Sequence, residues 1–262
     1  MPALEVQGLV ARYGERTILD GVDLAVERGE IRVILGGSGS GKTTLLKHCI
    51  GLLDPAAGRV SILGAPLLGL EGAARTAILR RLGVLFQSGA LLGSISVGAN
   101  VALPLREHTD LPEPIVAEMV RMKLAAVELL HAEHLLPSEL SGGMRKRAAL
   151  ARALALDPEL LFCDEPSAGL DPLTSAELDE LILRLRDRFG MAIVVVTHEL
   201  MSIERIADRA LMLGQGKVIA DGTLAEVKRG AHPEIRAFFG RVAAGELRGA
   251  PSALEVLRGP GR

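Results

Sequence analysis

The sequence has few aromatic side chains, few cysteines and almost no net charge. It contains no tryptophan, one tyrosine and five phenylalanines, and its two cysteines are Cys49 and Cys163. These cysteines lie far apart and form no CxxC pair, which argues against a disulfide framework and predicts two buried, reduced thiols. Because 30 lysine and arginine residues are balanced by 32 acidic residues, the composition predicts no basic surface for nucleic acid.

The sequence also lacks a long uninterrupted apolar run. Residues 88–105 carry no charge over about the length that spans a bilayer, but glycines, serines, Asn100 and Pro104 interrupt the apolar side chains. We therefore expect no membrane-spanning helix there. The N-terminal residues show no basic stretch followed by an apolar one, which argues against a signal peptide and favours a cytoplasmic protein.

Strand patterns alternate with helix patterns along most of the chain. Short apolar runs rich in β-branched residues predict buried strands at 31–37, 159–165 and 191–199. A helix is expected to begin at Lys42, directly after the first of these runs. Strands that alternate with helices predict a parallel sheet covered on both faces, so we assign the chain to the α/β class.

Further segments complete the predicted organisation. Extended, glycine-punctuated stretches occupy 4–14 and 17–30, and a closing hairpin is expected around Gln215-Gly216. Thr174 and Glu177 have the spacing of a capping box, which predicts that a helix starts there. Residues 88–157 are mostly helical in pattern and form a candidate inserted lobe. One helical face of this lobe is expected to carry Val116, Met119, Val120, Leu124 and Val127.

The strongest chemical signal is GGSGSGKTT at residues 36–44, which fits the pattern G-x-x-x-x-G-K-[ST] between a strand and a helix. Glycines let consecutive backbone N–H groups turn toward phosphate oxygens, and the helix start adds its positive dipole end. Lys42 would reach the β- and γ-phosphates, and the Thr43 hydroxyl would ligate Mg²⁺. The predicted nucleotide-binding residues are Gly36, Gly37, Ser38, Gly39, Ser40, Gly41, Lys42, Thr43 and Thr44.

Two adjacent carboxylates at a strand end indicate hydrolysis. Asp164 would hold Mg²⁺, and Glu165 is placed to orient and deprotonate a water molecule. His198 follows another buried strand and would reach the same carboxyl edge of the sheet, where ligands of such folds bind. There it could donate a hydrogen bond to the γ-phosphate. Together these residues favour an ATPase over other nucleotide-binding proteins.

These residues, together with three further motifs, resemble the ordered motif set of an ABC-transporter ATPase subunit. The set comprises Gly36 to Thr43, Gln87 in LFQSG, LSGGM at 140–144, LLFCDEP at 160–166, SAGLD at 167–171, and His198. The resemblance covers residues 4 to about 240. It implies a P-loop NTPase (RecA-like) core with an N-terminal antiparallel β subdomain and an inserted α-helical signature subdomain. The implied division is an ABC ATPase domain at 1–240, with the insertion at about 88–157, and a C-terminal tail at 241–262.

The resemblance also implies roles for five residues. Ser141 and Gly143 would complete a nucleotide site that belongs to a second subunit, so the chain would form a homodimer with two composite sites. Asp171 would cross the dimer interface. Gln87 would contact Mg²⁺ or the attacking water and report the nucleotide state. Tyr13 would stack on the adenine base.

Within the family, the segments 86–108, 137–158 and 164–172 are similar to ATPases of Mla/MCE-type phospholipid transporters. This similarity implies an integral membrane permease, further Mla-type components, and a peripheral location at the cytoplasmic face of the inner membrane. The uncharged run after Gln87 would form part of an apolar groove for a permease helix, with a buried lobe core as the alternative. Two other functions stay open: an ABC ATPase for another cargo, such as an amino acid, metal or drug, and a soluble ABC protein that acts on ribosomes or DNA.

Overall fold

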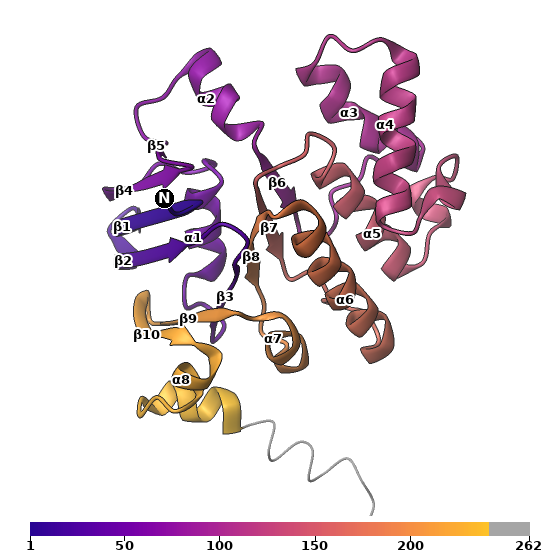
Figure 1. Cartoon of the computed structure of the whole chain (residues 1–262). Coiled ribbons are helices and arrows are strands. Elements are labelled where there is room, and N and C mark those ends of the chain that lie inside the picture. The colour runs from indigo at the N-terminus through magenta and orange to yellow at the C-terminus, as the bar shows by residue number, and fades with distance from the viewer. Residues whose placement is uncertain (241–262) are drawn as a thin grey trace, which may run out of the picture.

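Two β-sheets form the framework of the computed structural model, which describes residues 1–240 (Figure 1). The N-terminal sheet has the strand order β2-β1-β4-β5, and all of its pairings are antiparallel. Its strands are β1 (Leu4–Tyr13), β2 (Arg16–Val26), β4 (Ala57–Ile62) and β5 (Ala65–Pro66). The expected N-terminal antiparallel β subdomain is therefore confirmed.

The second sheet has the order β10-β9-β3-β8-β7-β6, and strands β9 to β6 in this order run parallel. The hairpin between β9 and β10 turns at Gln215 and Gly216, as the sequence predicts. The six strands are β3 (Ile31–Gly36), β6 (Leu82–Leu85), β7 (Leu160–Asp164), β8 (Ala192–Val196), β9 (Arg209–Gly214) and β10 (Lys217–Thr223).

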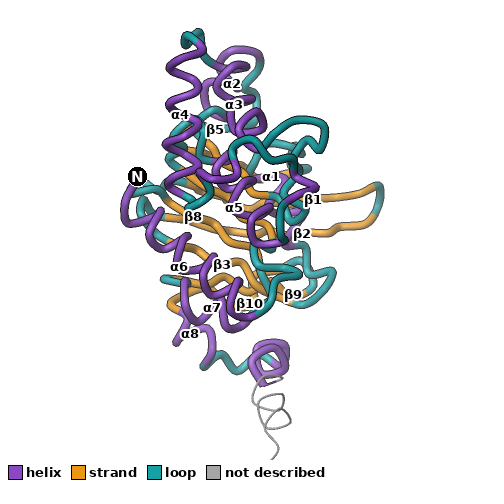
Figure 2. The backbone as a smooth tube through the Cα atoms, turned by 90° about the vertical axis from the view of Figure 1, so that its right-hand side faces the viewer, coloured by secondary structure: helices purple, strands orange, loops and turns teal. Residues whose placement is uncertain are grey.

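The helices lie mainly on one side of this parallel sheet. In Figure 1, α3, α4 and α5 form a group at the upper right, apart from the N-terminal sheet, and Figure 2 shows the helical side face-on. The helices are α1 (Lys42–Cys49), α2 (Gly72–Leu79), α3 (Val97–His108), α4 (Glu113–Ala126), α5 (Gly142–Ala153), α6 (Pro172–Phe189), α7 (Leu200–Ile206) and α8 (Leu224–Lys228). Short 3₁₀ turns occupy Leu130–Ala132 and Pro137–Glu139.

Alternate side chains of the parallel strands contribute to two different hydrophobic cores. Val33 and Val195 pack with the helices α3 to α6, whereas Ile34, Phe162 and Val194 pack under the N-terminal sheet and α1. Successive side chains of a strand point to opposite faces, so a strand covered on both faces must be apolar throughout. This explains the apolar run of β8 and of most of β3, in which the buried Arg32 is the exception and forms an ion pair with Asp221.

The helical part of the uncharged run after Gln87, from Val97 onward, supplies core residues of the helical region. Val97, Val101 and Leu105 are fully buried, while Leu92 is 49% exposed. Asn100 is also buried. Its Oδ1 accepts a hydrogen bond from the N–H of Leu92 at 2.8 Å, and its Nδ2 donates to the carbonyl oxygen of Leu92 at 3.0 Å. The buried-core alternative therefore holds for the helical part of this segment, whereas residues 92–94 are exposed. Within residues 1–240, no helix is both long and apolar enough to cross a membrane.

One predicted helix start is wrong. Helix α6 begins at Pro172, and its N-cap is Asp171, whose carboxylate accepts hydrogen bonds from the N–H groups of Leu173 and Thr174. Thr174 therefore lies inside the helix, and its hydroxyl donates to Asp171. Aspartate is at least as good an N-cap as threonine, and Pro172 at the first helical position favours the earlier start.

Other local predictions agree with the structure. Val116, Val120, Leu124 and Val127 are buried in the helical core, and Met119 packs against them with partial exposure. Cys49 and Cys163 are both buried and free, and burial raises the pKa of each thiol to about 12. Both cysteines are therefore uncharged structural residues at neutral pH.

Candidate nucleotide-binding site

The glycine-rich loop runs from the end of β3 to the start of α1. Gly36, Gly39 and Gly41 have φ angles of 146°, 76° and 103°, which L side chains rarely adopt. A Cβ on Gly36 would lie 2.3 Å from the carbonyl oxygen of Leu213, and one on Gly41 would lie 2.5 Å from Leu19. These glycines are therefore required by backbone conformation and by close packing against β9 and β2.

Lys42 lies folded over this loop. Its Nζ donates to the carbonyl oxygens of Gly36 and Gly37 at 2.8 and 3.0 Å. Burial lowers the pKa of Lys42, and the nearby Glu165 and Asp164 carboxylates oppose that shift. The ammonium group is therefore held at the mouth of the loop, where it can exchange carbonyl partners for an anion.

The start of α1 leaves donors available for a ligand. Its N-cap residue is Gly41, and no side chain within residues 1–240 caps the helix. The backbone N–H groups at this end, with the hydroxyls of Thr43 and Thr44 beside them, carry the positive end of the helix dipole. Within the described residues, the Ser40 Oγ atom is buried without a hydrogen-bond partner. An open helix end beside a buried, unpartnered hydroxyl suits a phosphate group.

The carboxyl edge of the parallel sheet supplies the acidic and imidazole groups. Asp164 ends β7 in register with Val196 of β8, so Asp164, Glu165 and His198 emerge together. The Nδ1 atom of His198 lies 2.7 Å from Oε1 of Glu165. The other oxygen of Glu165, Oε2, is buried and has no hydrogen-bond partner within residues 1–240. One carboxylate oxygen is thus held by the histidine, and the other is buried without a partner in the described part of the chain.

Burial and neighbouring charges both shift the pKa of Asp164. Burial raises the pKa of this carboxyl group, and the adjacent Glu165 raises it further, while Lys146, Lys47 and Lys42 oppose the shift. A nearby cation would favour the charged form of Asp164, so this position suits a metal-binding or cation-binding carboxylate.

An open cavity of about 620 Å³ joins the loop and the strand ends. It brings Lys42, Glu165 and His198 together, as the sequence predicts, and it adds Leu200 of α7 and Phe238 from the helical segment 233–240. No motif marks these last two residues, because they reach the cavity only through the packing of distant segments. The cavity lining consists of Gly36, Gly37, Ser38, Lys42, Glu165, His198, Leu200 and Phe238.

Several predicted residues lie outside this lining, among them Tyr13 and Gln87. Tyr13 ends β1 and is 53% exposed, so its ring is available for a ligand but does not line the cavity. Gln87 follows β6, and its side chain is exposed. Its carbonyl oxygen accepts a hydrogen bond from Nζ of Lys146 at 2.6 Å, a contact that sequence reasoning missed.

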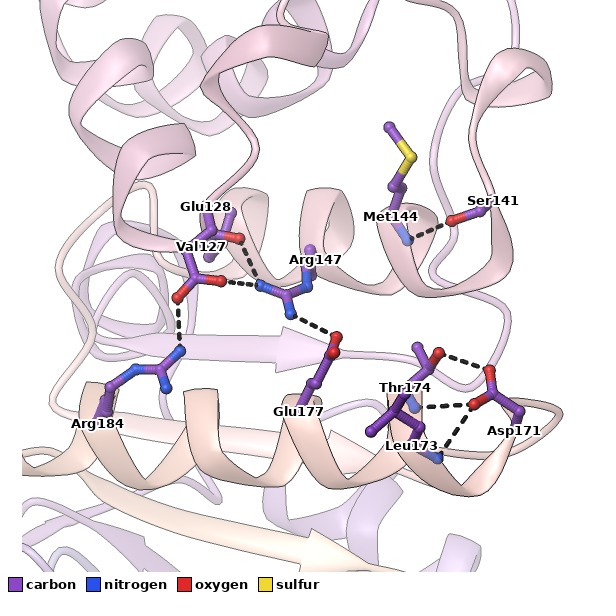
Figure 3. Close-up of polar contacts among 10 residues, drawn as sticks. All are labelled: Val127, Glu128, Ser141, Met144, Arg147, Asp171, Leu173, Thr174, Glu177 and Arg184. Atoms are coloured by element: carbon purple, nitrogen blue, oxygen red, sulfur yellow. Dashed lines mark hydrogen bonds and ion pairs between the residues drawn. The ribbon is translucent and has the colours of Figure 1, made fainter.

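Two further predicted residues, Ser141 and Asp171, cap two other helices (Figure 3). Ser141 is exposed and caps α5, where its Oγ accepts from the N–H of Met144 at 3.2 Å. Gly143 lies in the first turn of α5, where a Cβ would come within 2.5 Å of Thr174. Asp171 is exposed and caps α6, and hydrogen bonds from Thr174 lower its pKa. None of the three lines the cavity that holds Lys42, so a single chain does not bring them to its own phosphate loop.

Comparisons with known proteins agree with this geometry. A family model described as ABC transporter matches residues 19–168. The intermembrane phospholipid transport system ATP-binding protein MlaF of Haemophilus influenzae is 46% identical over 220 residues, which cover 84% of this chain and 83% of the relative. The probable ribonucleotide transport ATP-binding protein mkl of Mycobacterium bovis is 40% identical over 237 residues, which cover 90% of this chain and 66% of the relative.

A solved structure shows the same fold. It is the dimeric, post-hydrolysis state of the ATP-binding cassette MJ0796 bound to ADP and Pi, with a TM-score of 0.76 and 30% identity. The match covers 84% of this chain and 98% of that chain. These likenesses confirm the expected P-loop NTPase fold with its added β and helical parts. The chain belongs to the ABC transporter family of ATP-binding proteins.

Proposed function

We propose that this chain is the ATP-hydrolysing subunit of an ABC transporter that moves phospholipid. The observation that carries the hydrolytic part is the single cavity in which Lys42 and the Glu165–His198 pair meet, with one Glu165 oxygen unpartnered. The cargo is supported by the 46% identity to a phospholipid-transport ATP-binding protein.

The site fits ATP with Mg²⁺ on structural grounds. The uncapped start of α1, the unpartnered Ser40 hydroxyl and the ammonium group of Lys42 all suit phosphate oxygens. Thr43, Asp164 and Gln87 would supply oxygen ligands of the kind that Mg²⁺ prefers. When bound, Mg²⁺ would neutralise part of the phosphate charge.

Glu165 and His198 would divide the work of hydrolysis. Because Oε1 of Glu165 is held by His198, the carboxylate has a fixed orientation, and Oε2 is the oxygen that can accept a proton from water. Lys42 would stabilise the charge that grows on the phosphate oxygens during bond cleavage. The other imidazole nitrogen, Nε2, would then face the phosphate or the attacking water.

A homodimer would complete this site. Ser141, Gly143 and Asp171 lie at exposed helix ends away from their own chain's cavity, so they would serve the nucleotide of the partner subunit. Tyr13, exposed at the end of β1, would stack on adenine. Two equivalent composite sites follow from two-fold symmetry. The domain division would be an ATPase domain at 1–240, with a helical insertion at about 88–157; the tail at 241–262 lies outside the described residues.

A groove between α2, β6 and α3 is the surface that we assign to the permease. A cavity of about 400 Å³ there is lined by Leu79 of α2, Val84 and Phe86 at β6, and Pro104 and His108 of α3. Its mixed apolar and polar lining suits a short helix of an integral membrane protein. The subunit would then lie peripherally at the cytoplasmic face of the inner membrane, together with further Mla-type components.

Two surface substitutions test this assignment. Thr76 is exposed on α2 and lines the groove, so Thr76→Glu should leave folding and ATP binding intact yet prevent co-purification with a membrane permease. Leu92→Glu is the matched control, because Leu92 is exposed but lies outside the groove lining. Equal permease recovery with both variants would contradict the groove assignment.

The cargo needs a separate test, because one relative is named for ribonucleotide transport. Deleting the gene and measuring the phospholipid content of inner and outer membrane fractions addresses it directly. A changed lipid distribution, restored by the wild-type gene and not by the Glu165→Gln gene, supports phospholipid transport. An unchanged distribution with lost uptake of a polar solute would favour another cargo.

A further inference from the structure

Lys146 is a buried cation whose two partners are both backbone carbonyl groups at the proposed hydrolysis site. It lies on α5, five residues after Ser141, and is 7% exposed. Its Nζ donates to the carbonyl oxygen of Gln87 at 2.6 Å and to that of Glu165 at 3.1 Å. A single side chain of the helical region therefore joins the segments that follow β6 and β7.

The Glu165 carbonyl is at a backbone position that needs support. Glu165 has φ of 47°, a left-handed conformation that is unfavourable for a residue with a side chain. Its N–H donates to Val196 of β8 at 2.8 Å, and its carbonyl oxygen also accepts from Ala168 at 3.2 Å. Lys146 adds a charged donor to this carbonyl. The contacts from β8 and α5 thus hold the peptide groups on both sides of Glu165, and with them the direction of its side chain.

The burial of Lys146 has an energetic cost that core packing alone does not explain. An ammonium group taken out of water must be compensated by hydrogen bonds, and an aliphatic side chain would fill the same space without that cost. Lys123 on α4 provides a comparison within the same helical region. It is also buried, at 6% exposed, but its partner is the carboxylate of Asp157, and neither residue lines the nucleotide cavity.

We propose that Lys146 is a positioning residue that holds the backbone of Gln87 and Glu165 in the geometry required for hydrolysis. This inference rests on the proposed function, in which Glu165 is the general base. Because Lys146 lies on α5, whose N-cap is Ser141, any shift of this helix relative to the sheet would move both carbonyl contacts at once. Helix α5 would thus have two roles. Its start presents Ser141 and Gly143 to the nucleotide of the partner subunit, and its Lys146 orients Glu165 at the nucleotide of its own chain.

Three variants test the inference. Lys146→Met keeps the length and removes the donors, so kcat for ATP should fall at least about tenfold, while KM changes less than about twofold because the phosphate loop is untouched. Lys146→Arg keeps the charge and can donate to both carbonyl groups, so it should recover most of the lost kcat. Lys123→Met, the matched control, should lower the unfolding temperature without lowering kcat.

Amide hydrogen exchange supplies a readout that is independent of turnover. Lys146→Met should accelerate exchange in residues 86–89 and 163–168, and Lys123→Met should leave both segments unchanged. Unaltered exchange in these segments, or a kcat loss that Lys123→Met reproduces at an equal loss of stability, would overturn the inference.

A double variant separates this inference from the proposed function. If Lys146 acts through Glu165, then adding Lys146→Met to Glu165→Gln should reduce the residual hydrolysis by less than about twofold. A further tenfold loss would overturn the inference while leaving the base assignment intact. Near-wild-type turnover in Glu165→Gln alone would instead contradict the proposed base, and hydrogen exchange would then decide whether Lys146 holds the two segments.

Discussion

The starts of α1 and α5 use the same physical feature in opposite ways. At α1 the N-cap is Gly41, no side chain of the described residues caps the helix, and the helix end opens into the cavity that contains Lys42. At α5 the Ser141 hydroxyl caps the helix through Met144 and leaves the N–H of Gly143 to other partners. An uncapped end can bind an anion within its own chain, whereas a capped, exposed end is stable alone and can still contribute to a partner's site.

The largest expected effect comes from a substitution in the cavity into which the start of α1 opens. Glu165→Gln keeps the side-chain shape and removes the base, so ATP hydrolysis should fall by at least about 10²-fold. Binding of ATP should persist, because Lys42 and the phosphate loop are unchanged. The variant should therefore accumulate as an ATP-bound dimer, which size-exclusion chromatography with nucleotide would detect.

Lys42→Ala is the matched control for that experiment. It should lose ATP binding itself and stay monomeric with nucleotide, since the removed ammonium group is the loop's own cation. Turnover of Glu165→Gln within a few-fold of wild type would exclude Glu165 as the general base.

A smaller effect is expected from the capped end at α5. Ser141→Arg should reduce ATPase activity by about tenfold or more, because a hydrogen bond to a charged group contributes about 1.5–3 kcal/mol. The ATP affinity of the dilute monomer should not change, since Ser141 does not line its own chain's cavity. Fluorescent nucleotide titration below the dimerisation concentration would measure this affinity.

Mixing Ser141→Arg chains with Lys42→Ala chains sharpens the result. In the heterodimer, one composite site combines the intact phosphate loop of the Ser141→Arg chain with the intact Ser141 of the Lys42→Ala chain. Part of the activity should therefore return. If Ser141→Arg already weakens ATP binding by the monomer, the signature works within its own chain and the proposed composite site is wrong.

The sequence predicted the phosphate loop well because its chemistry is local. The glycines that the backbone angles require are those of the motif, and Lys42 lies five or six residues from the carbonyls it bonds. Phe238 and Lys146 were missed because each reaches the site through the packing of distant segments, with no spacing pattern to mark it. The start of α6 was misassigned because two good caps, Asp171 and Thr174, lie three residues apart.

The uncharged run of residues 88–105 shows a different limit of sequence reasoning. Absence of charge is compatible both with a surface groove and with a core, and for α3 the two differ in which of its faces packs against α4 and α5. The structure buries Val97, Val101 and Leu105, while Pro104 lines the groove. Hydrophobicity alone could not separate these residues, since they alternate along one helix.

Two aspartates of α6, the N-cap Asp171 and the internal Asp179, show how exposure changes the pKa of a carboxyl group. Asp171 is exposed, and hydrogen bonds lower its pKa, whereas Asp179 is 1% exposed and burial raises its pKa to about 6. Ser202 and Arg205 of α7 favour the charged form of Asp179, and the neighbouring Glu199 and Glu180 oppose it. One oxygen of Asp179 has no hydrogen-bond partner within the described residues.

The smallest effect that we predict follows from this buried carboxyl group. A carboxyl with a raised pKa in the folded state stabilises the protein most below its unfolded pKa of about 3.9, and that contribution is lost as the pH rises through about 6. Asp179→Asn removes the charge, so its free energy of unfolding at pH 7.5 should exceed that of wild type by about 1 kcal/mol. Below the unfolded pKa, at about pH 3.5, the difference should nearly vanish. Thermal unfolding of both proteins across this range measures it, and a difference that does not depend on pH would show that Asp179 is not the titrating group.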